Sequence, residues 1–243
     1  MSIELKSLQK IYSQNNVGLG STSLSIPDSQ WVSLIGPSGS GKTTLLRLIA
    51  GLDSSTGGSI SKSFEKNEIS YVFQDSALLP WLTVIDNIIL PLTLRGVSIQ
   101  QAKQEAENWI KKLKLEKFLE HYPVQLSGGL KMRVSVARAL ITKPKLILLD
   151  EPFAALDEPI RIELGLELRD LWKSLRPTIV FVTHSITEAL WLSDRVLVFQ
   201  GHPGKLILDR VLNFGEDRPL ALRGQEGFQS LVEECFQLLR SSP

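Results

Sequence analysis

The stretch that decides the fold of this chain runs Gly36-Pro37-Ser38-Gly39-Ser40-Gly41-Lys42-Thr43. It follows an apolar strand pattern at residues 32–35 and precedes a helix pattern at residues 44–50. Glycines in such a turn let backbone N–H groups converge on phosphate oxygens, and the N-terminus of the following helix adds a partial positive charge. The pattern G-x-x-x-x-G-K-[ST] in this context predicts a phosphate-binding loop, with Lys42 reaching the β- and γ-phosphates and Thr43 holding Mg²⁺.

The composition of the 243 residues narrows the class of protein. Lys and Arg number 27 and Asp and Glu 26, and this net charge of +1 gives no electrostatic footprint for nucleic acid and no polybasic membrane anchor. The single cysteine, Cys235, excludes a disulfide framework within the chain, fits a reducing compartment and is predicted to be a small buried hydrophobe. The start of the chain lacks a signal-peptide pattern, and no apolar run approaches the ~18 residues that span a bilayer. We expect a soluble chain whose membrane role needs a partner.

Strand and helix patterns alternate along the chain. Predicted strands cover residues 3–8, 21–26, 31–35, 59–63, 69–73, 146–149 and 179–182, with a hairpin at 196–200 and 205–211. Predicted helices cover residues 44–50, 84–95, 99–114, 116–121, 129–141, 160–173 and 225–240. The apolar strands on either side of helix 160–173 indicate a parallel βαβ unit. We expect one nucleotide-binding domain over residues 1–243: a core at about 1–75 and 142–243, a helical subdomain at about 76–141, and no room for a C-terminal regulatory domain.

A second chemical signal is the pair Asp150-Glu151 at the end of the apolar strand 146–149. Ligands bind at the carboxyl ends of such strands in open α/β sheets. Asp150 is placed to bind Mg²⁺ through water, and Glu151 to polarise an attacking water as a general base. Solvated acids at a strand end are common, so the phosphate loop is what favours the functional interpretation here.

These two motifs, with Leu126-Ser127-Gly128-Gly129 between them, resemble the ATP-binding cassette (ABC) ATPases. The resemblance covers nearly the whole chain, because four further family positions fit in order: an adenine-stacking aromatic, the Q-loop glutamine, the D-loop aspartate and the switch histidine. They are Tyr12, Gln74, Asp157 and His184. The resemblance implies an α/β P-loop NTPase fold of the ABC type, with a RecA-like mixed-sheet core, N-terminal antiparallel strands and the inserted helical subdomain.

The resemblance also implies ATP and Mg²⁺ as ligands and assigns roles to residues. The implied nucleotide-binding residues are Tyr12, Gly36, Pro37, Ser38, Gly39, Ser40, Gly41, Lys42, Thr43, Thr44, Ser127, Gly128, Gly129 and Asp157. The implied catalytic residues are Glu151, His184, Lys42 and Gln74, and the implied metal ligands are Thr43, Gln74 and Asp150. In this family the Ser-Gly-Gly run of one copy meets the γ-phosphate held by the phosphate loop of another. Two departures from the family pattern are Leu130, where Gln or Met is common, and Ala155, where Ser is frequent.

Each of these residues also has a purely structural interpretation. Tyr12 can be a packed strand aromatic, Gln74 a surface residue, Asp157 an N-cap and His184 a structural histidine. The basic residues after Gly129 are expected to form a solvated or packing face of their helix; they are Lys131, Arg133 and Arg138. Substitution of Arg133 or Leu130 is therefore expected to be mild.

Several stretches point to one branch of the family. Residues 73–84, 130–135, 151–157 and 203–205 resemble importer ATPases for nitrate, taurine and alkanesulfonates and their thiamine-precursor relatives. The expected partners are a second copy, membrane permease subunits docking near Gln74 to Trp81, and indirectly a periplasmic or extracellular solute-binding protein, but no nucleic acid. Trp81 can alternatively pack within its own subdomain. The expected location is peripheral, on the cytoplasmic face of the bacterial inner membrane.

Three other functions are weighed against this one. A chromosome-maintenance or repair ATPase carries long coiled coils between its half-motifs, and the short segment from Gln74 to Ser127 has no sustained heptads. A phosphoryl-transfer kinase does not need the Leu-Ser-Gly-Gly run. A non-catalytic nucleotide-binding regulator does not need Lys42, Glu151 and His184 together.

Overall fold

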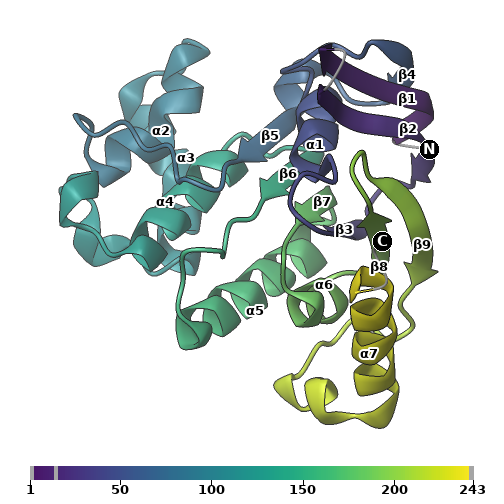
Figure 1. Ribbon diagram of the computed structural model, residues 1–243. Helices are drawn as coiled ribbons and strands as arrows, with labels where there is room; N and C mark the ends of the chain where they lie inside the picture. Colours follow the sequence, from purple (N-terminus) through teal and green to yellow (C-terminus); the bar gives the residue numbers. More distant parts are fainter. Residues whose placement is uncertain (1–2, 14–15, 241–243) are drawn as a thin grey trace.

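The computed structural model describes residues 3–13 and 16–240, and in this part of the chain the strands form two sheets. The smaller sheet is antiparallel, has the order β2-β1-β4 and lies beside α1 (Figure 1). Its strands are β1 (Ile3–Ser13), β2 (Asn16–Ile26) and β4 (Gly57–Lys62). The larger sheet has the order β5-β6-β7-β3-β8-β9 and is parallel except for the last strand.

The larger sheet sets the position of the phosphate loop. Its strands are β3 (Trp31–Ile35), β5 (Ile69–Val72), β6 (Leu146–Asp150), β7 (Thr178–Val182), β8 (Arg195–Gln200) and β9 (Lys205–Val211). All five residues of β3, of β6 and of β7 are buried, which explains their continuous apolar sequence. Because these three strands are parallel neighbours, the segments that follow them emerge at the same edge of the sheet.

Helices cover both faces of this sheet. They are α1 (Lys42–Ala50), α2 (Val84–Leu94), α3 (Ile99–Lys112), α4 (Gly128–Leu140), α5 (Glu158–Leu175), α6 (Ile186–Leu192) and α7 (Glu226–Arg240). Short 3₁₀ turns lie at Lys66–Glu68, Glu116–Phe118, Pro123–Gln125 and Leu220–Gly224. Helices α2, α3 and α4 gather in a lobe away from the small sheet (Figure 1).

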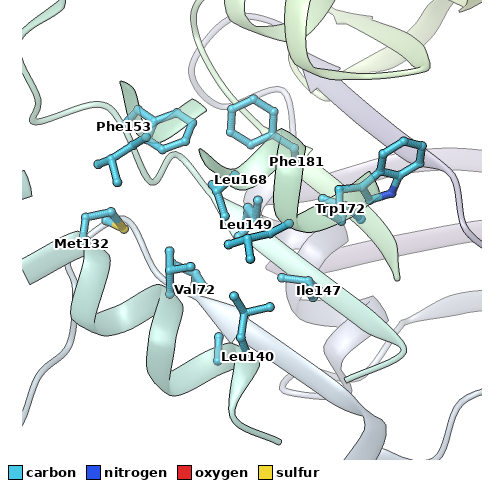
Figure 2. Packing of buried hydrophobic residues seen from close by; sticks show 14 of the residues in the cluster. Val72, Met132, Leu140, Ile147, Leu149, Phe153, Leu168, Trp172 and Phe181 are labelled. Atoms are coloured by element: carbon cyan, nitrogen blue, oxygen red, sulfur yellow. The ribbon is translucent and has the colours of Figure 1, made fainter. Parts of the chain in front are cut away.

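The core is divided by the larger sheet into two apolar clusters. Side chains alternate along β3, so that Val32 and Leu34 pack with α1 and the small sheet while Trp31 and Ile35 pack on the opposite face. Figure 2 shows part of that opposite cluster, where Leu149 of β6 lies among side chains of α4, α5 and the neighbouring strands. Each large apolar side chain buried in this way contributes roughly 1.5–3 kcal/mol.

Most predicted elements are confirmed, including the parallel βαβ unit, the hairpin and the final helix, and Cys235 is buried. Two predictions are wrong. The first two strands are longer than expected, since β1 and β2 continue as a paired ribbon through polar, exposed positions. The predicted helix 116–121 is only a 3₁₀ turn at Glu116–Phe118, too short for the helical pattern expected there. Helix α6 had no counterpart among the predicted elements.

Candidate nucleotide-binding and catalytic site

The phosphate loop connects β3 to α1 in a conformation that requires glycine. Gly39 and Gly41 have φ values of 80° and 89°, in the left-handed region where side chains are strained. A Cβ on Gly41 would also overlap the carbonyl oxygen of Gly18 in β2. The sequence pattern of the loop therefore reflects both its backbone conformation and its close approach to the small sheet.

The side chain of Lys42 forms hydrogen bonds within the phosphate loop. Its Nζ donates to the carbonyl oxygens of Gly36 and Pro37 at 2.8 and 2.9 Å and lies 3.3 Å from Ser40 Oγ. Burial lowers the pKa of this ammonium group, and the carboxylates of Glu151 and Asp150 oppose that shift. The loop is thus preformed around a buried cation that faces the carboxylates.

Asp150 is held between two hydroxyl donors. Thr43 Oγ1 donates to Oδ1 at 2.9 Å and Tyr71 Oη to Oδ2 at 2.8 Å. Burial, and then the charge of Asp150, raises the pKa of Tyr71, so the phenol remains a donor. No sequence motif marks Tyr71. Its position in β5, the strand that pairs with β6, is the feature that could have predicted a contact with Asp150.

Glu151 and His184 meet at the ends of β6 and β7. His184 Nε2 lies 2.6 Å from Glu151 Oε1, and the side chains are 48% and 11% exposed respectively. Glu151 has a φ of 49°, in the left-handed region, immediately after the last strand residue. This turn presents the carboxylate to the histidine of the neighbouring strand, with the histidine on the solvent side.

A cavity of about 430 Å³ brings most of the predicted site residues together. Its lining is Tyr12, Asn16, Val17, Gly18, Ser38, Gly39, Gly41, Lys42, Thr43, Thr44, Gln74, Glu151, His184 and His202. Four of these were not predicted: Asn16, Val17 and Gly18 from β2, and His202 from the β8–β9 turn. No local motif marks these four residues, because their elements reach the phosphate loop only through tertiary packing.

Tyr12 lies on one wall of this cavity as an exposed side chain. It is 48% exposed, its hydroxyl donates to Asp53 Oδ2 at 2.9 Å, and Lys10 Nζ lies 4.9 Å from its ring centroid. Its ring also lies against Gly18 of β2, so Tyr12 is a half-exposed aromatic whose uncovered part lies on the cavity wall.

The Ser127-Gly128-Gly129 run is not among the residues that line the cavity. Ser127 is the N-cap of α4 and accepts a hydrogen bond from Leu130 N at 3.4 Å. Ser127 and Gly128 are exposed, whereas Gly129 is buried. Gly129 packs against Ile160, since a Cβ at this position would lie 2.8 Å from Ile160 Cγ2. The structure thus places a helix N-terminus, with its free N–H groups, on the surface away from the phosphate loop of the same chain.

Asp157 lies beside this second surface. It is the N-cap residue of α5 by position, but its side chain makes no capping hydrogen bond. The side chain is exposed, and the Cβ position of Gly128 lies near Leu156 and Ala155, the two preceding residues. Asp157 and the Ser-Gly-Gly run therefore form one exposed region.

Two of the basic residues on α4 are structural anchors. Arg133 is buried, and its Nη1 lies 2.6 Å from Glu167 Oε2 and donates to Leu113 O at 3.2 Å. Arg138 donates to the carbonyl oxygens of Ala77 and Ser76 at 2.9 and 2.8 Å. This geometry predicts that substitution of Arg133 lowers the stability of the chain, which is separate from the mild functional effect expected from the sequence, because Glu167 would lose its largely buried partner.

The donor set fits a metal that needs few protein ligands. Within residues 3–13 and 16–240, no group of three or more His, Cys, Asp or Glu side chains is arranged to hold a metal ion. Mg²⁺ takes one or two protein ligands and completes its shell with phosphate oxygens and water. The hydroxyl of Thr43, next to the Asp150 carboxylate and in the cavity that Gln74 also lines, suits that ion.

Exposed apolar side chains lie on both sides of Gln74 in the sequence. Trp81 is 69% exposed and Phe73 39%, so the alternative in which Trp81 packs within its own subdomain does not fit. Among the described residues, no helix combines the length and the apolarity needed to cross a membrane.

Comparisons with known proteins place the chain in a family. Residues 19–154, more than half of the chain, match the ABC transporter family. The chain therefore belongs to the ABC transporter family, as a cassette that binds and hydrolyses ATP. The predicted ABC ATPase resemblance, fold class and ATPase activity are confirmed.

Relatives refine this placement. The chain is 36% identical to an aliphatic sulfonates import ATP-binding protein, SsuB, of Bacillus cereus, over 98% of this chain and 95% of the relative. It is 40% identical to an uncharacterised ABC transporter ATP-binding protein of Methanocaldococcus jannaschii, over 85% and 80%. Its fold is similar to the dimeric structure of MJ0796, a bacterial ABC transporter cassette, with a TM-score of 0.78, 32% identity and coverage of 87% and 99%. A post-hydrolysis structure of that cassette, bound to ADP and Pi, gives a TM-score of 0.77.

Proposed function

We propose that this chain is the ATP-hydrolysing subunit of an importer for small anionic solutes of the sulfonate type. The observation that carries this proposal is the division of the predicted site residues between two surfaces. The cavity unites Lys42 with Glu151 and His184, while the Ser127-Gly128-Gly129 run lies outside it. One chain thus offers both halves of a composite site but does not close it.

Within the cavity, the phosphate loop and Lys42 bind the β- and γ-phosphates. The ammonium group already has three oxygen partners in the loop, and phosphate oxygens would replace them as stronger, charged acceptors. Thr44 at the start of α1 adds to the binding wall, and Tyr12 stacks on adenine. Thr43 and Gln74 hold Mg²⁺, with Asp150 acting through water. The ion, when bound, neutralises charge that builds up on the transferred phosphoryl group.

Glu151 and His184 carry out the hydrolytic step. Their contact of 2.6 Å ties up the carboxylate oxygen that must accept a proton from water. A γ-phosphate in the cavity would compete for His184 Nε2 as a second acceptor. We infer that His184 moves toward that phosphate and leaves Glu151 available to polarise the attacking water.

A second copy completes the site. The exposed N-terminus of α4 supplies N–H groups and a partial positive charge, and Ser127 adds a hydroxyl. Facing the γ-phosphate of the other copy, this surface would bury two ATP molecules between two chains. Asp157, beside it, would lie in the same interface. The dimeric form of the similar MJ0796 cassette supports this arrangement.

The transported solute and the partners are proposed from relatives and from one exposed surface. Relatives of similar length import aliphatic sulfonates, and a sulfate/thiosulfate import protein of Photorhabdus laumondii is 41% identical over 82% of this chain. Residues 74–81, with the exposed Trp81, would receive a cytoplasmic helix of a membrane permease. A solute-binding protein outside the membrane would deliver the solute, and this chain would lie on the cytoplasmic face of the bacterial membrane. The division into a core and a helical subdomain at residues 76–141 is proposed with it.

Two measurements test the proposal. The first is Mg²⁺-dependent ATP hydrolysis by the purified chain, which we expect to rise more than linearly with protein concentration because two chains form each site. A linear dependence would contradict the composite site. The second is reconstitution with the permease subunits encoded next to its gene, followed by uptake of an alkanesulfonate, sulfate and nitrate. Uptake of none of these anions would overturn the solute class while leaving the ATPase assignment intact.

A further inference from the structure

The β8–β9 turn packs backbone against backbone on the phosphate loop. A Cβ on Gly204 would overlap the carbonyl oxygen of Ser40, and a Cβ on Gly36 would overlap the carbonyl oxygen of Phe199. The turn also approaches the small sheet, since a Cβ on Gly20 would lie 3.0 Å from Gly204 O. In Figure 1 this turn reaches up to the start of α1. The turn therefore packs directly on the backbone of the phosphate loop.

His202 at the tip of this turn makes a polar contact with the loop. Its Nδ1 lies 2.7 Å from the carbonyl oxygen of Gly39, within hydrogen-bond distance. A carbonyl can only accept, so the ring must carry its proton on Nδ1 in this contact. His202 also lines the nucleotide cavity, although it is distant in sequence from every motif.

The acceptor residue, Gly39, is a glycine whose peptide orientation must be fixed by its contacts. Glycine samples both halves of the Ramachandran map, so the backbone at Gly39, with a φ of 80°, is held in one conformation only by its contacts. A hydrogen bond to its carbonyl fixes which way that peptide faces. While it accepts a hydrogen bond from His202, the Gly39 carbonyl oxygen cannot turn toward a bound phosphate, which it would repel.

We propose that His202 is a positioning residue for nucleotide binding, which holds the Gly39 carbonyl of the phosphate loop away from the phosphates. It acts through the loop, and the Gly204–Ser40 packing keeps the turn in place for that contact. This inference rests on ATP binding in the cavity and adds a residue that no sequence motif of the family marks.

Binding of Mg-ATP to the full-length chain tests this role. We expect His202→Ala to raise the Kd about 3- to 10-fold, which corresponds to one lost hydrogen bond. In His202→Asn, the Nδ2 of the amide can take the place of Nδ1 and should recover most of the affinity. Lys205→Ala, an exposed position of the same hairpin that does not line the cavity, is the matched control and should bind like the wild type.

A merely structural role would give a different pattern. In that case His202→Ala would lower the melting temperature of the nucleotide-free chain, and the asparagine variant would not restore affinity. Wild-type affinity in His202→Ala, or equal loss in the alanine and asparagine variants, would overturn the proposal. Failure of the wild-type chain to bind Mg-ATP would instead contradict the proposed function.

Gly204→Ala gives a second, independent test. Its Cβ would push the turn away from Ser40, so a folded variant should lose at least as much affinity as His202→Ala. If Gly204→Ala does not fold, the histidine series still decides the question. A folded Gly204→Ala variant with wild-type affinity would show that the turn does not position the loop.

Discussion

The cavity around the phosphate loop and the surface at the start of α4 differ in the partners that their polar groups have within the chain. In the cavity, Lys42, Asp150 and Glu151 each have a partner within 3 Å. At the start of α4, Ser127 and Gly128 are exposed, and the Ser127 hydroxyl accepts a hydrogen bond from Leu130 N of its own helix. The first region is built to hold a ligand alone, and the second only adds to a ligand held elsewhere. This difference supports the proposal that one chain binds ATP and a second copy completes the site for hydrolysis.

The largest expected effect is that of replacing Glu151, the proposed general base, because this change should stop hydrolysis and leave ATP binding and dimer formation intact. We expect Glu151→Gln to lower kcat by about 10³-fold, since general-base catalysis is worth roughly 10²–10⁴. The glutamine keeps the shape of the side chain, so the cavity should still bind ATP and the dimer should persist. Gel filtration with Mg-ATP checks this outcome, and a variant that elutes as a monomer would count against the composite site.

Mixing two inactive variants tests whether the two halves come from different chains. We expect Lys42→Ala and Gly128→Asp each to lose about 100-fold in ATPase activity, the first through its phosphate loop and the second by placing a carboxylate against the γ-phosphate. A mixed dimer would contain one intact composite site, so the mixture should regain activity. Continued inactivity of the mixture would show that both halves act within one chain. At Gly128 a Cβ meets only ordinary contacts, whereas at Gly129 it would overlap Ile160, so Gly128 is the safer position.

The helix that carries the exposed surface depends on Arg133. We expect Arg133→Ala to lower the free energy of unfolding by about 2–3 kcal/mol, because Glu167 would lose its buried partner and keep only Lys114. Lys131→Ala on the same helix is the matched control and should stay within about 0.5 kcal/mol. Urea denaturation measures both variants. Equal stabilities would show that the buried pair does not anchor α4 to α5.

Trp81 tests a third surface without touching either half-site. We expect Trp81→Ala to weaken association with the permease about 30-fold or more, as for an aromatic anchor at an interface, and to leave the ATPase activity of the isolated chain unchanged. Leu94→Ala is a suitable control, since this leucine is 78% exposed at the end of α2. Co-purification with the permease subunits measures the difference, and similar losses for both variants would argue against a specific docking site.

The smallest expected effect concerns Cys235. Burial raises the pKa of this thiol to about 11, so at pH 7.5 the group is protonated and lacks the thiolate that reacts. We expect alkylation of the folded chain to be slow at neutral pH and to accelerate as the pH approaches the raised pKa. Full reactivity should appear on unfolding in urea. Rapid labelling of the folded chain at pH 7.5 would contradict the burial of α7 against the core.

The sequence predicted the elements whose information is local. The phosphate loop, the apolar strands and the capped helix after Ser127 all lie where their patterns indicate. It underestimated the end of β1 and the beginning of β2, because these segments are held by pairing with each other and carry no clear alternation of polar and apolar residues. It left open whether Arg133 lies on a solvated or a packing face, since nothing near position 133 indicates that Glu167, on another helix, lies 2.6 Å away.

The candidate site divides in the same way. Local patterns indicated Lys42, Thr43 and Glu151, because phosphate binding and hydrolysis need those groups at fixed places on a loop or a strand end, and the family resemblance added His184. Tertiary structure decided that Tyr71 donates to Asp150, that His184 contacts Glu151 and that His202 reaches Gly39. It also decided that Ser127 faces away from the cavity. These are contacts between segments far apart in the chain, and only the packing of the sheets and helices brings such segments together.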